Sequence, residues 1–336
     1  MFGQIYRNGY IRHLLDIMTS PKPVLPGSQA PLLTRYLDGS DPALSLYAFQ
    51  FGGQLVPIFL AIMIEGSRMG NSKNLLSFTV MWGYAMQTCG YAITMPIYGA
   101  VQLFISPTFV SSGKALATAV VPQNASHFDL GVLVPAFFVG YFLPTLLMSL
   151  PLSPAVHQWL GATWQGFPLY VVACQHLFAR LVNVAPQSNA EVLSRAYNWA
   201  FNIAAVTQLC TYALILAVKT APGLFPSWAQ AAFSFSSVFR PGRFYSTEPL
   251  PSLATAMHDF FKWDQYVGSV AAITWGIALY LTSRKSNLSW RAWATLSWNI
   301  LWWSVLAGPA GALMRLLQRR DEAIVSTREK NDVKDP

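Results

Sequence analysis

The feature that most limits what this chain can fold into is its shortage of charge. Only 11% of its 336 residues are Asp, Glu, Lys or Arg, while 53% are hydrophobic. Soluble globular proteins carry about 25% charged residues, which solvate their surface. The hydrophobic residues of this chain are also gathered into long runs. We therefore predict an all-α fold, a polytopic transmembrane helical bundle in which lipid replaces water around most of the surface.

Seven segments reach the roughly 20 apolar residues that a helix needs to cross the hydrocarbon core. Asp41 and Pro42 are typical of a helix start, and Pro96 is expected to kink the second segment. Only residues 151–154 join segments three and four, which should therefore pack side by side. An eighth span is conceivable in the connection 219–264, although its prolines argue against one. The seven segments are 43–64, 76–104, 130–150, 155–180, 196–218, 265–283 and 289–314.

The helical bundle is expected to cover residues 41–317, with a polar segment at each end. Residues 1–40 lack the apolar core and cleavage site of a secretory signal, and could lie on the membrane as an amphipathic segment. Residues 318–336 are densely charged and are expected to be disordered. We expect an integral, multi-pass membrane protein, placed in the endoplasmic reticulum.

The orientation of the bundle depends on the basic residues beside the spans. The arginines of residues 315–320 favour a cytosolic C-terminus, which with seven spans puts the N-terminus in the lumen. The basic residues of 284–291, between the last two spans, argue for the opposite orientation. In the first orientation the sequons at Asn124 and Asn287 face the lumen, and both are predicted glycosylation sites.

Several classes of partner can be set aside from composition and spacing. The net charge is +8, but the basic residues lie between apolar runs, so they are expected to face the lipid bilayer and not nucleic acid. Cys89, Cys174 and Cys210 lie in apolar runs without CxxC spacing and are expected to fill the core. No spacing indicates a metal site, and no aspartate-rich motif is present to bind Mg²⁺ for ionising a prenyl diphosphate. We expect no metal and no cofactor.

Two acidic residues occupy positions where chemistry could occur within the bundle. Glu65 ends the first span, where burial would keep its carboxyl protonated and able to donate a proton. Equally, Glu65 could form a surface ion pair with Arg68, three residues later on the helix. Asp264 stands at the entrance of the sixth span, where it could be an acid or simply cap its own helix. Asp259 should point to a different face of that helix.

Aromatic and amide side chains are the candidates for binding a substrate. Trp263, Tyr266 and Trp275 could face a developing cation through cation–π contacts. Asn198 and Asn202 share one face of the fifth span. Amides in hydrocarbon more often bond between helices than bind a substrate, so an interhelical role is the first expectation for this pair.

Two stretches carry a resemblance to a known family. One is Glu65-Gly-Ser-Arg68, and the other is the stretch 260–268, FFKWDQYVG. With the chain length and the number of spans, they make residues 40–315 resemble the fungal membrane-bound terpene cyclases of meroterpenoid biosynthesis, the ascofuranone, ascochlorin and macrophorin type. The resemblance implies a redox-neutral, metal-independent cyclisation, of isomerase or lyase type, of the farnesyl chain on a prenylated aromatic. A pathway epoxidase and a prenyltransferase would supply that substrate.

The resemblance also implies that the reaction begins with protonation of a terminal epoxide or alkene. On the chemistry of the residues, we hypothesise that Asp264 or Glu65 donates that proton, while the other carboxyl orients the proton or removes the final one. The main alternative is a multi-span transporter for a small hydrophobic metabolite, with the same acids as a proton pathway. The sequence reveals neither internal repeats nor paired broken helices, which weakens that alternative. A third interpretation is a scaffold that holds soluble enzymes through the charged tail.

Overall fold

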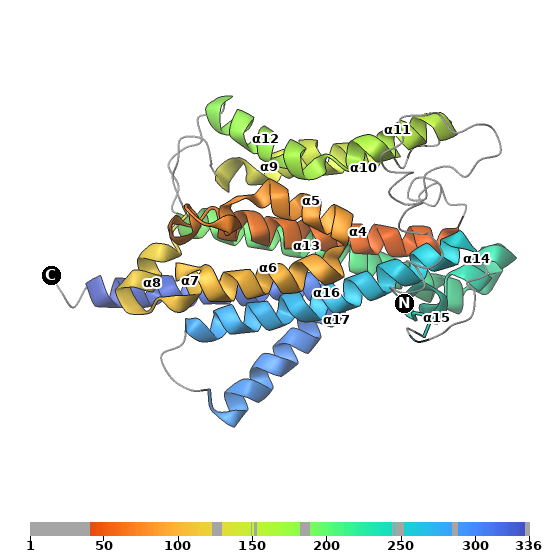
Figure 1. The fold of residues 1–336 in the computed structure, drawn as a ribbon. Helices are drawn as coiled ribbons and strands as arrows, with labels where there is room; N and C mark the ends of the chain where they lie inside the picture. The colour runs from red at the N-terminus through yellow and green to blue at the C-terminus, as the bar shows by residue number, and fades with distance from the viewer. Residues whose placement is uncertain are drawn as a thin grey trace.

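The computed structural model describes residues 41–332, apart from 123–129, 149, 151–152, 182–188, 244, 246–251 and 284–287. Within these ranges the chain is helical, without a strand, and the one bridge pairs Arg68 with Pro122. The prediction of an all-α fold is confirmed. Figure 1 shows α4 and α13 in the middle of the molecule, with α5 and the layer α9–α12 on one side and α6, α16 and α17 on the other.

Helix α4 (Pro42–Gly66) is the centre of the bundle. It begins as predicted: the Asp41 side chain accepts a hydrogen bond from Leu44 N at 3.1 Å, and Pro42 occupies the first turn. From Val56 to Gly66 every residue is buried. A helix with no exposed face must have neighbours all round, and α13, α16, α17 and α5 are among those that supply them (Figure 1).

The predicted second span is two helices, α5 (Thr79–Cys89) and α6 (Tyr91–Ile105). They meet at Gly90, whose φ of +88° suits glycine and few other residues. Pro96 lies inside the continuous α6, so the break occurs at Gly90 and not at the proline. Two short 3-10 helices precede this pair, η1 (Met69–Asn71) and η2 (Leu75–Ser77). Two short α-helices follow it, α7 (Pro107–Val110) and α8 (Gly113–Ala119).

Predicted segments three and four pack side by side, as expected. They form η3 (Leu130–Val132), α9 (Leu133–Phe137), η4 (Phe138–Phe142), α10 (Leu143–Met148), α11 (Pro154–Trp164) and α12 (Phe167–Leu181). The ring centroids of Tyr141 and Phe167 are 4.9 Å apart. Gly140 lets the two helical arms of this hairpin approach closely, because a Cβ there would lie 2.5 Å from the backbone nitrogen of Val171.

The connection after α13 (Asn189–Thr220) is built from short helices. These are η5 (Pro222–Leu224), α14 (Ser227–Ala232) and α15 (Phe235–Phe239), and none is long enough to cross a membrane. The ring of Phe239 lies 5.9 Å from that of Tyr47, so α15 packs on the start of α4. Helix α16 (Leu253–Thr282) follows, and it begins well before the predicted span 265–283.

Helix α17 (Trp290–Asp332) is broken at Gly308, where φ is +69°. Gln54 of α4 fills the break: its Nε2 donates to Ala307 O at 3.2 Å, and its Oε1 accepts from Ala310 N at 3.2 Å. A helix can break inside an apolar environment when another side chain satisfies the freed backbone groups. In the sequence, the pair Gly308-Pro309 is the one local sign of this break.

The predicted disordered tail is the main correction to the fold. Residues 318–332 continue α17, and Arg320 and Asp321 are 0% and 8% exposed. Ile324 packs with Leu116 and Val120 of the α8 region in a small apolar cluster. The end of α17 is therefore part of the folded bundle.

Among the described residues, three helices are long and apolar enough to cross a membrane: Pro42–Gly66, Ala190–Thr220 and Trp290–Ile324. Tyr91–Ile105 and Leu133–Met148 are apolar but shorter. Association with a membrane is supported, whereas the count of seven spans is not confirmed, because breaks such as that at Gly90 divide the predicted segments. Trp290, Trp298 and Trp302 are exposed by half or more, as interface anchors would be.

Candidate active site

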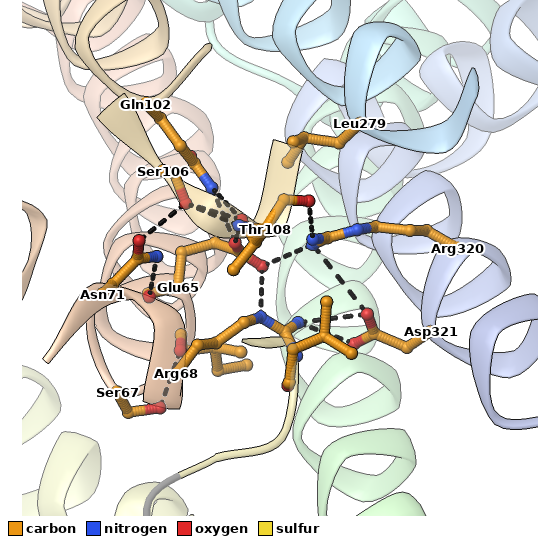
Figure 2. A network of polar contacts seen from close by, with 12 residues as sticks. Glu65, Ser67, Arg68, Asn71, Gln102, Ser106, Thr108, Leu279, Arg320 and Asp321 are labelled. Carbon is orange, nitrogen blue, oxygen red and sulfur yellow. Dashed lines mark hydrogen bonds and ion pairs between the residues drawn. The ribbon is translucent and has the colours of Figure 1, made fainter. Parts of the chain in front are cut away.

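Glu65 lies in the last turn of α4 and is 0% exposed. Its Oε1 accepts hydrogen bonds from Arg68 Nε and Arg320 Nη1, both at 2.7 Å. Its Oε2 accepts from Gln102 Nε2 at 2.6 Å and from Thr108 Oγ1 at 3.4 Å. Figure 2 shows these side chains converging on the carboxyl group. Two guanidinium groups at this distance hold Glu65 as a carboxylate.

Arg68 extends the network to a second acid. Its Nη2 donates to Asp321 Oδ2 at 2.8 Å and Oδ1 at 3.1 Å, and its Nη1 donates to the carbonyl of Val120. Tyr197 of α13 donates to Asp321 Oδ2 at 2.9 Å. Burial alone would lower the pKa of the Arg68 guanidinium, but the charges of Asp321 and Glu65 raise it well above its ordinary value.

The network contains equal numbers of buried positive and negative groups, Arg68 and Arg320 against Glu65 and Asp321. Such a set costs desolvation when it forms, but removing one member leaves an uncompensated buried charge. The pair Glu65–Arg68 therefore forms as predicted, yet inside the protein and not at its surface. The network fastens the end of α17 to the end of α4.

Sequence reasoning missed Arg320 and Asp321 because the charge of the tail suggested disorder. A signal was available: Leu313, Leu317 and Ile324 follow one another at helical spacing, with the two charged residues on the same stripe. An apolar stripe that continues into a charged segment indicates a packed helix.

Asp264 lies in the middle of α16, so the alternative that it caps its own helix is wrong. It caps another helix instead. Its Oδ2 accepts from Tyr91 N at 3.1 Å and its Oδ1 from Ala92 N at 2.8 Å, at the start of α6 beside Gly90. Asp264 is 8% exposed and makes no ion pair within the described ranges. Asp259 faces elsewhere, as predicted, with Lys262 Nζ 3.6 Å from its Oδ1.

Aromatic rings line the surroundings of Asp264. The ring of Phe51 lies 6.3 Å from that of Tyr91 and 6.0 Å from that of Phe261. Phe260 also reaches this point, since its Cζ would be 3.7 Å from a Cβ on Gly90. A carboxyl group that accepts only two backbone N–H bonds among rings differs sharply from Glu65, which faces two arginines.

Trp263 and Tyr266 use their polar atoms to hold the connection that precedes α16. Trp263 Nε1 donates to Gly242 O at 3.1 Å, and Tyr266 OH donates to Phe239 O at 2.6 Å. Lys262 Nζ donates to the same stretch, at Arg240 O, at 3.1 Å. The aromatic motif around Asp264 therefore anchors α15 and the residues after it.

Trp275 lies eleven residues after Asp264, about three turns further along the same face of α16, and is buried against α6. It is 2% exposed, and its ring is 5.6 Å from that of Tyr98. Asn198 makes an interhelical contact, accepting from Arg315 Nη1 at 2.6 Å, whereas the Asn202 side chain is exposed. The expected interhelical role thus holds for Asn198. Among the described contacts, neither amide binds Asp264 or Glu65.

The remaining predicted residues give little to the site. Cys89 and Cys210 are exposed, which corrects the expectation that they fill the core, and Cys174 is half-buried. In the ranges that the structure describes, no group of three His, Cys, Asp or Glu side chains could hold a metal ion. Asn124 and Asn287 lie outside the described residues.

Glu65 and Asp264 do not share one location. Asp264 binds α6 at Ala92, whereas Glu65 binds the same helix at Gln102. Ten residues of helix separate these contacts, a rise of about 15 Å at 1.5 Å per residue. The two carboxyl groups therefore cannot act together on one small group. This corrects the hypothesis that one of them orients the proton that the other donates.

Comparison with known proteins identifies relatives over most of the chain. The profile of one family, described as the CtvD domain, matches residues 30–325. The chain is 28% identical over 298 residues to terpene cyclase ascI of Acremonium egyptiacum, covering 85% of this chain and 74% of the relative. It is 26% identical over 290 residues to terpene cyclase ctvD of Aspergillus terreus, covering 84% and 78%.

A third relative is matched over less than a third of its own length. FAD-dependent monooxygenase anuJ of Penicillium roqueforti is 25% identical over 269 residues, which cover 80% of this chain but only 31% of that protein. No solved structure matches the chain.

Proposed function

The chain belongs to the CtvD domain family, and from this premise we propose that it is a membrane terpene cyclase that closes rings in the prenyl chain of a meroterpenoid precursor. Named terpene cyclases among its relatives, matched over more than four-fifths of this chain, support the proposal. The observation that carries it at the level of the site is Asp264, a buried carboxyl group among aromatic rings that has no cationic partner in the described part of the chain.

Asp264 is the better proton donor of the two acids. Two guanidinium groups donate to the Glu65 carboxylate at 2.7 Å. If Glu65 were protonated, both would lose their negatively charged partner. Asp264 accepts only from two backbone N–H groups, and one oxygen keeps a lone pair for a proton while it still accepts. We therefore assign initiation to Asp264 and a structural role to the network of Glu65.

The reaction is an isomerisation in which the proton is borrowed and returned. Asp264 protonates a terminal epoxide or alkene, and the electrons of the next double bond form the new carbon–carbon bond. The cation that results is quenched by loss of a proton to the Asp264 carboxylate or by attack of a hydroxyl within the substrate, whose proton returns to the enzyme. Rings such as Phe51, Tyr91 and Phe261 stabilise the cation through their faces. The product has the mass of the substrate.

The substrate class follows from this chemistry: a prenylated aromatic with an alkene or epoxide at the end of its chain. A prenyltransferase and an epoxidase would supply it. The match to a part of a protein named an FAD-dependent monooxygenase supports an oxidative partner of this kind. A membrane location suits a substrate with a long hydrocarbon chain, and we propose the endoplasmic reticulum.

The transporter alternative gains one observation, because α17 and the pair α5–α6 are broken helices, a feature of many transporters. Side chains of the chain itself bind at both breaks: Gln54 binds backbone groups on either side of Gly308, and Asp264 binds the first N–H groups of α6. We retain the cyclase.

The test is to incubate microsomes that contain the chain with a farnesylated phenol and, separately, with its terminal epoxide. We expect an isomer of unchanged mass from one of them, detected by mass spectrometry. Microsomes from the same cells without the chain are the control. If neither compound, nor a broad panel of prenylated aromatics, is converted by well-expressed protein, the cyclase assignment fails and transport should be assayed instead.

A further inference from the structure

Three buried polar groups between α6 and α16 have no hydrogen-bond partner in the described part of the chain: Thr94 Oγ1, Tyr98 OH and Trp275 Nε1. Their residues are 2%, 0% and 2% exposed. Thr94 and Tyr98 are four residues apart and share one face of α6. The Tyr98 ring lies 5.6 Å from the Trp275 ring, and Gly99 gives Trp275 room, since a Cβ there would lie 3.3 Å from Trp275 Cβ. We call these three residues the unpaired patch.

Other buried polar atoms on the same helix also lack a partner among the described residues, namely Tyr91 OH and Gln102 Oε1. One turn beyond Tyr98, Gln102 donates to Glu65 at 2.6 Å, and near Thr94 the first N–H groups of α6 are satisfied by Asp264. Folded proteins leave few buried polar groups unpaired, because each such group has given up its bonds to water. Because these unpaired groups follow one another along one face of α6, the missing partner is expected to be a molecule that binds there.

The chemistry of the patch restricts that molecule. It offers two hydroxyl groups and one indole N–H, all of which can donate, and it carries no charge. The nearby guanidinium groups of Arg68 and Arg320 are already bound to Glu65, so the patch is not built for phosphate or carboxylate. Trp82 adds a third ring, 5.1 Å from Tyr98. Neutral donors beside edge-on rings suit an aromatic ring that carries a hydroxyl or carbonyl oxygen.

The position of the patch fits the two ends of one substrate. Thr94 follows Ala92, which binds Asp264, by two residues, and Tyr98 follows it by six. The patch therefore starts a few ångströms along α6 from the acid, and reaches about 9 Å from it at Tyr98. We propose that the unpaired patch binds the oxygen-bearing aromatic head of the substrate, so that its prenyl chain extends along α6 and its terminal alkene or epoxide meets Asp264. This inference rests on the proposed function.

No solvent reaches the patch in this structure, so a bound head must displace side chains that now pack against it. This makes the test unusually clear. Removing an unpaired hydroxyl costs the free protein no hydrogen bond, so Tyr98→Phe and Thr94→Val are expected to leave the thermal midpoint of detergent-solubilised protein unchanged or raised. The same changes should weaken binding of the head by about three- to tenfold, the loss of one hydrogen bond.

The probes are the parent phenol without its prenyl chain, and farnesol as a chain without an aromatic head. Binding is measured by the ligand-induced shift of the thermal midpoint. We expect Tyr98→Phe and Thr94→Val to weaken binding of the phenol and to leave binding of farnesol unchanged. Tyr141→Phe is the matched control: its hydroxyl donates to Gly52 O at 2.9 Å, so it should lower the midpoint and leave phenol binding unchanged.

Equal binding of the phenol by wild-type protein and both patch variants would overturn the proposal, as would weakened binding of farnesol alone. The measurement needs no turnover. Phenol binding that depends on the patch, without any cyclisation, would remove the proposed function and keep the binding site. Cyclisation together with phenol binding that the patch variants do not change would keep the proposed function and remove the proposed binding site.

Discussion

At the scale of single residues, the two buried carboxyl groups of Glu65 and Asp264 differ in their hydrogen-bond partners, and we assign them different roles for that reason. Glu65 meets two guanidinium groups, an amide and a hydroxyl, and every one of these stabilises its charge. Asp264 meets two backbone N–H groups at the end of a helix, which also favour a negative charge but through partial charges only. The sequence located both acids, but it could not rank them, because the partners of Glu65 lie as far as 255 residues away.

The role given to Glu65 predicts a loss of stability that a second change should repair. Glu65→Gln leaves Arg320 and Arg68 facing a neutral group, and breaking a buried ion pair in this way typically costs about 3–5 kcal/mol. The double variant Glu65→Gln, Arg320→Gln removes one positive charge as well and should recover part of that loss. Thermal midpoints of the purified variants in detergent check this. A double variant that is less stable than Glu65→Gln would contradict the account of a charge-balanced network.

At the scale of helices, the breaks are where sequence reasoning succeeded least. The start of α4 followed from Asp41 and Pro42, and the hairpin of segments three and four from its short connection. The breaks at Gly90 and Gly308 depend on side chains from other helices, Asp264 and Gln54, that replace the lost hydrogen bonds. Local patterns do not contain that information, so one apolar run was interpreted as one span.

The break at Gly90 should tolerate no side chain. Gly90→Ala would place a Cβ 2.6 Å from Asp264 Oδ1 on a residue whose φ is +88°. We expect a loss of roughly 1 kcal/mol or more from the backbone alone, together with displacement of the carboxyl group and a fall in turnover. Gly223→Ala is the matched control, because nothing lies within 4 Å of a Cβ there. Thermal midpoints and turnover of both variants test this, and equal behaviour would contradict the described cap.

The end of α17 makes a prediction about truncation. Deleting residues 318–336 removes Arg320 and Asp321, so Glu65 and Arg68 lose their partners, and the protein should be poorly expressed or inactive. Deleting only residues 325–336 keeps both residues and Ile324, and should preserve activity. The shorter deletion is also the proper test of a scaffold role for the charged tail. Activity of the longer deletion equal to that of the full chain would mean that the network is dispensable.

At the scale of the whole molecule, helices from both halves of the chain enclose the region between Asp264 and Glu65. Helices α4, α6 and α16 lie beside one another there (Figure 1), with buried rings and the unpaired patch between two fixed polar ends. Composition predicted the helical bundle and its place in a membrane. The spatial order of the helices could not be predicted from one sequence, since it depends on contacts between residues far apart in the chain.

The central claim is that Asp264 gives the proton that starts cyclisation, and one assay in deuterated buffer tests it most directly. Microsomes with wild-type chain, Asp264→Asn or the control Asp259→Asn receive the farnesylated phenol or its epoxide. Wild type and Asp259→Asn should form the isomer. That isomer should carry one deuterium on carbon if an alkene is protonated, and none after exchange in ordinary water if an epoxide is opened.

Asp264→Asn, at an equal level in the membrane, should lose at least about a hundredfold in rate, the usual contribution of a general acid. Conversion by Asp264→Asn at the wild-type rate would contradict the claim.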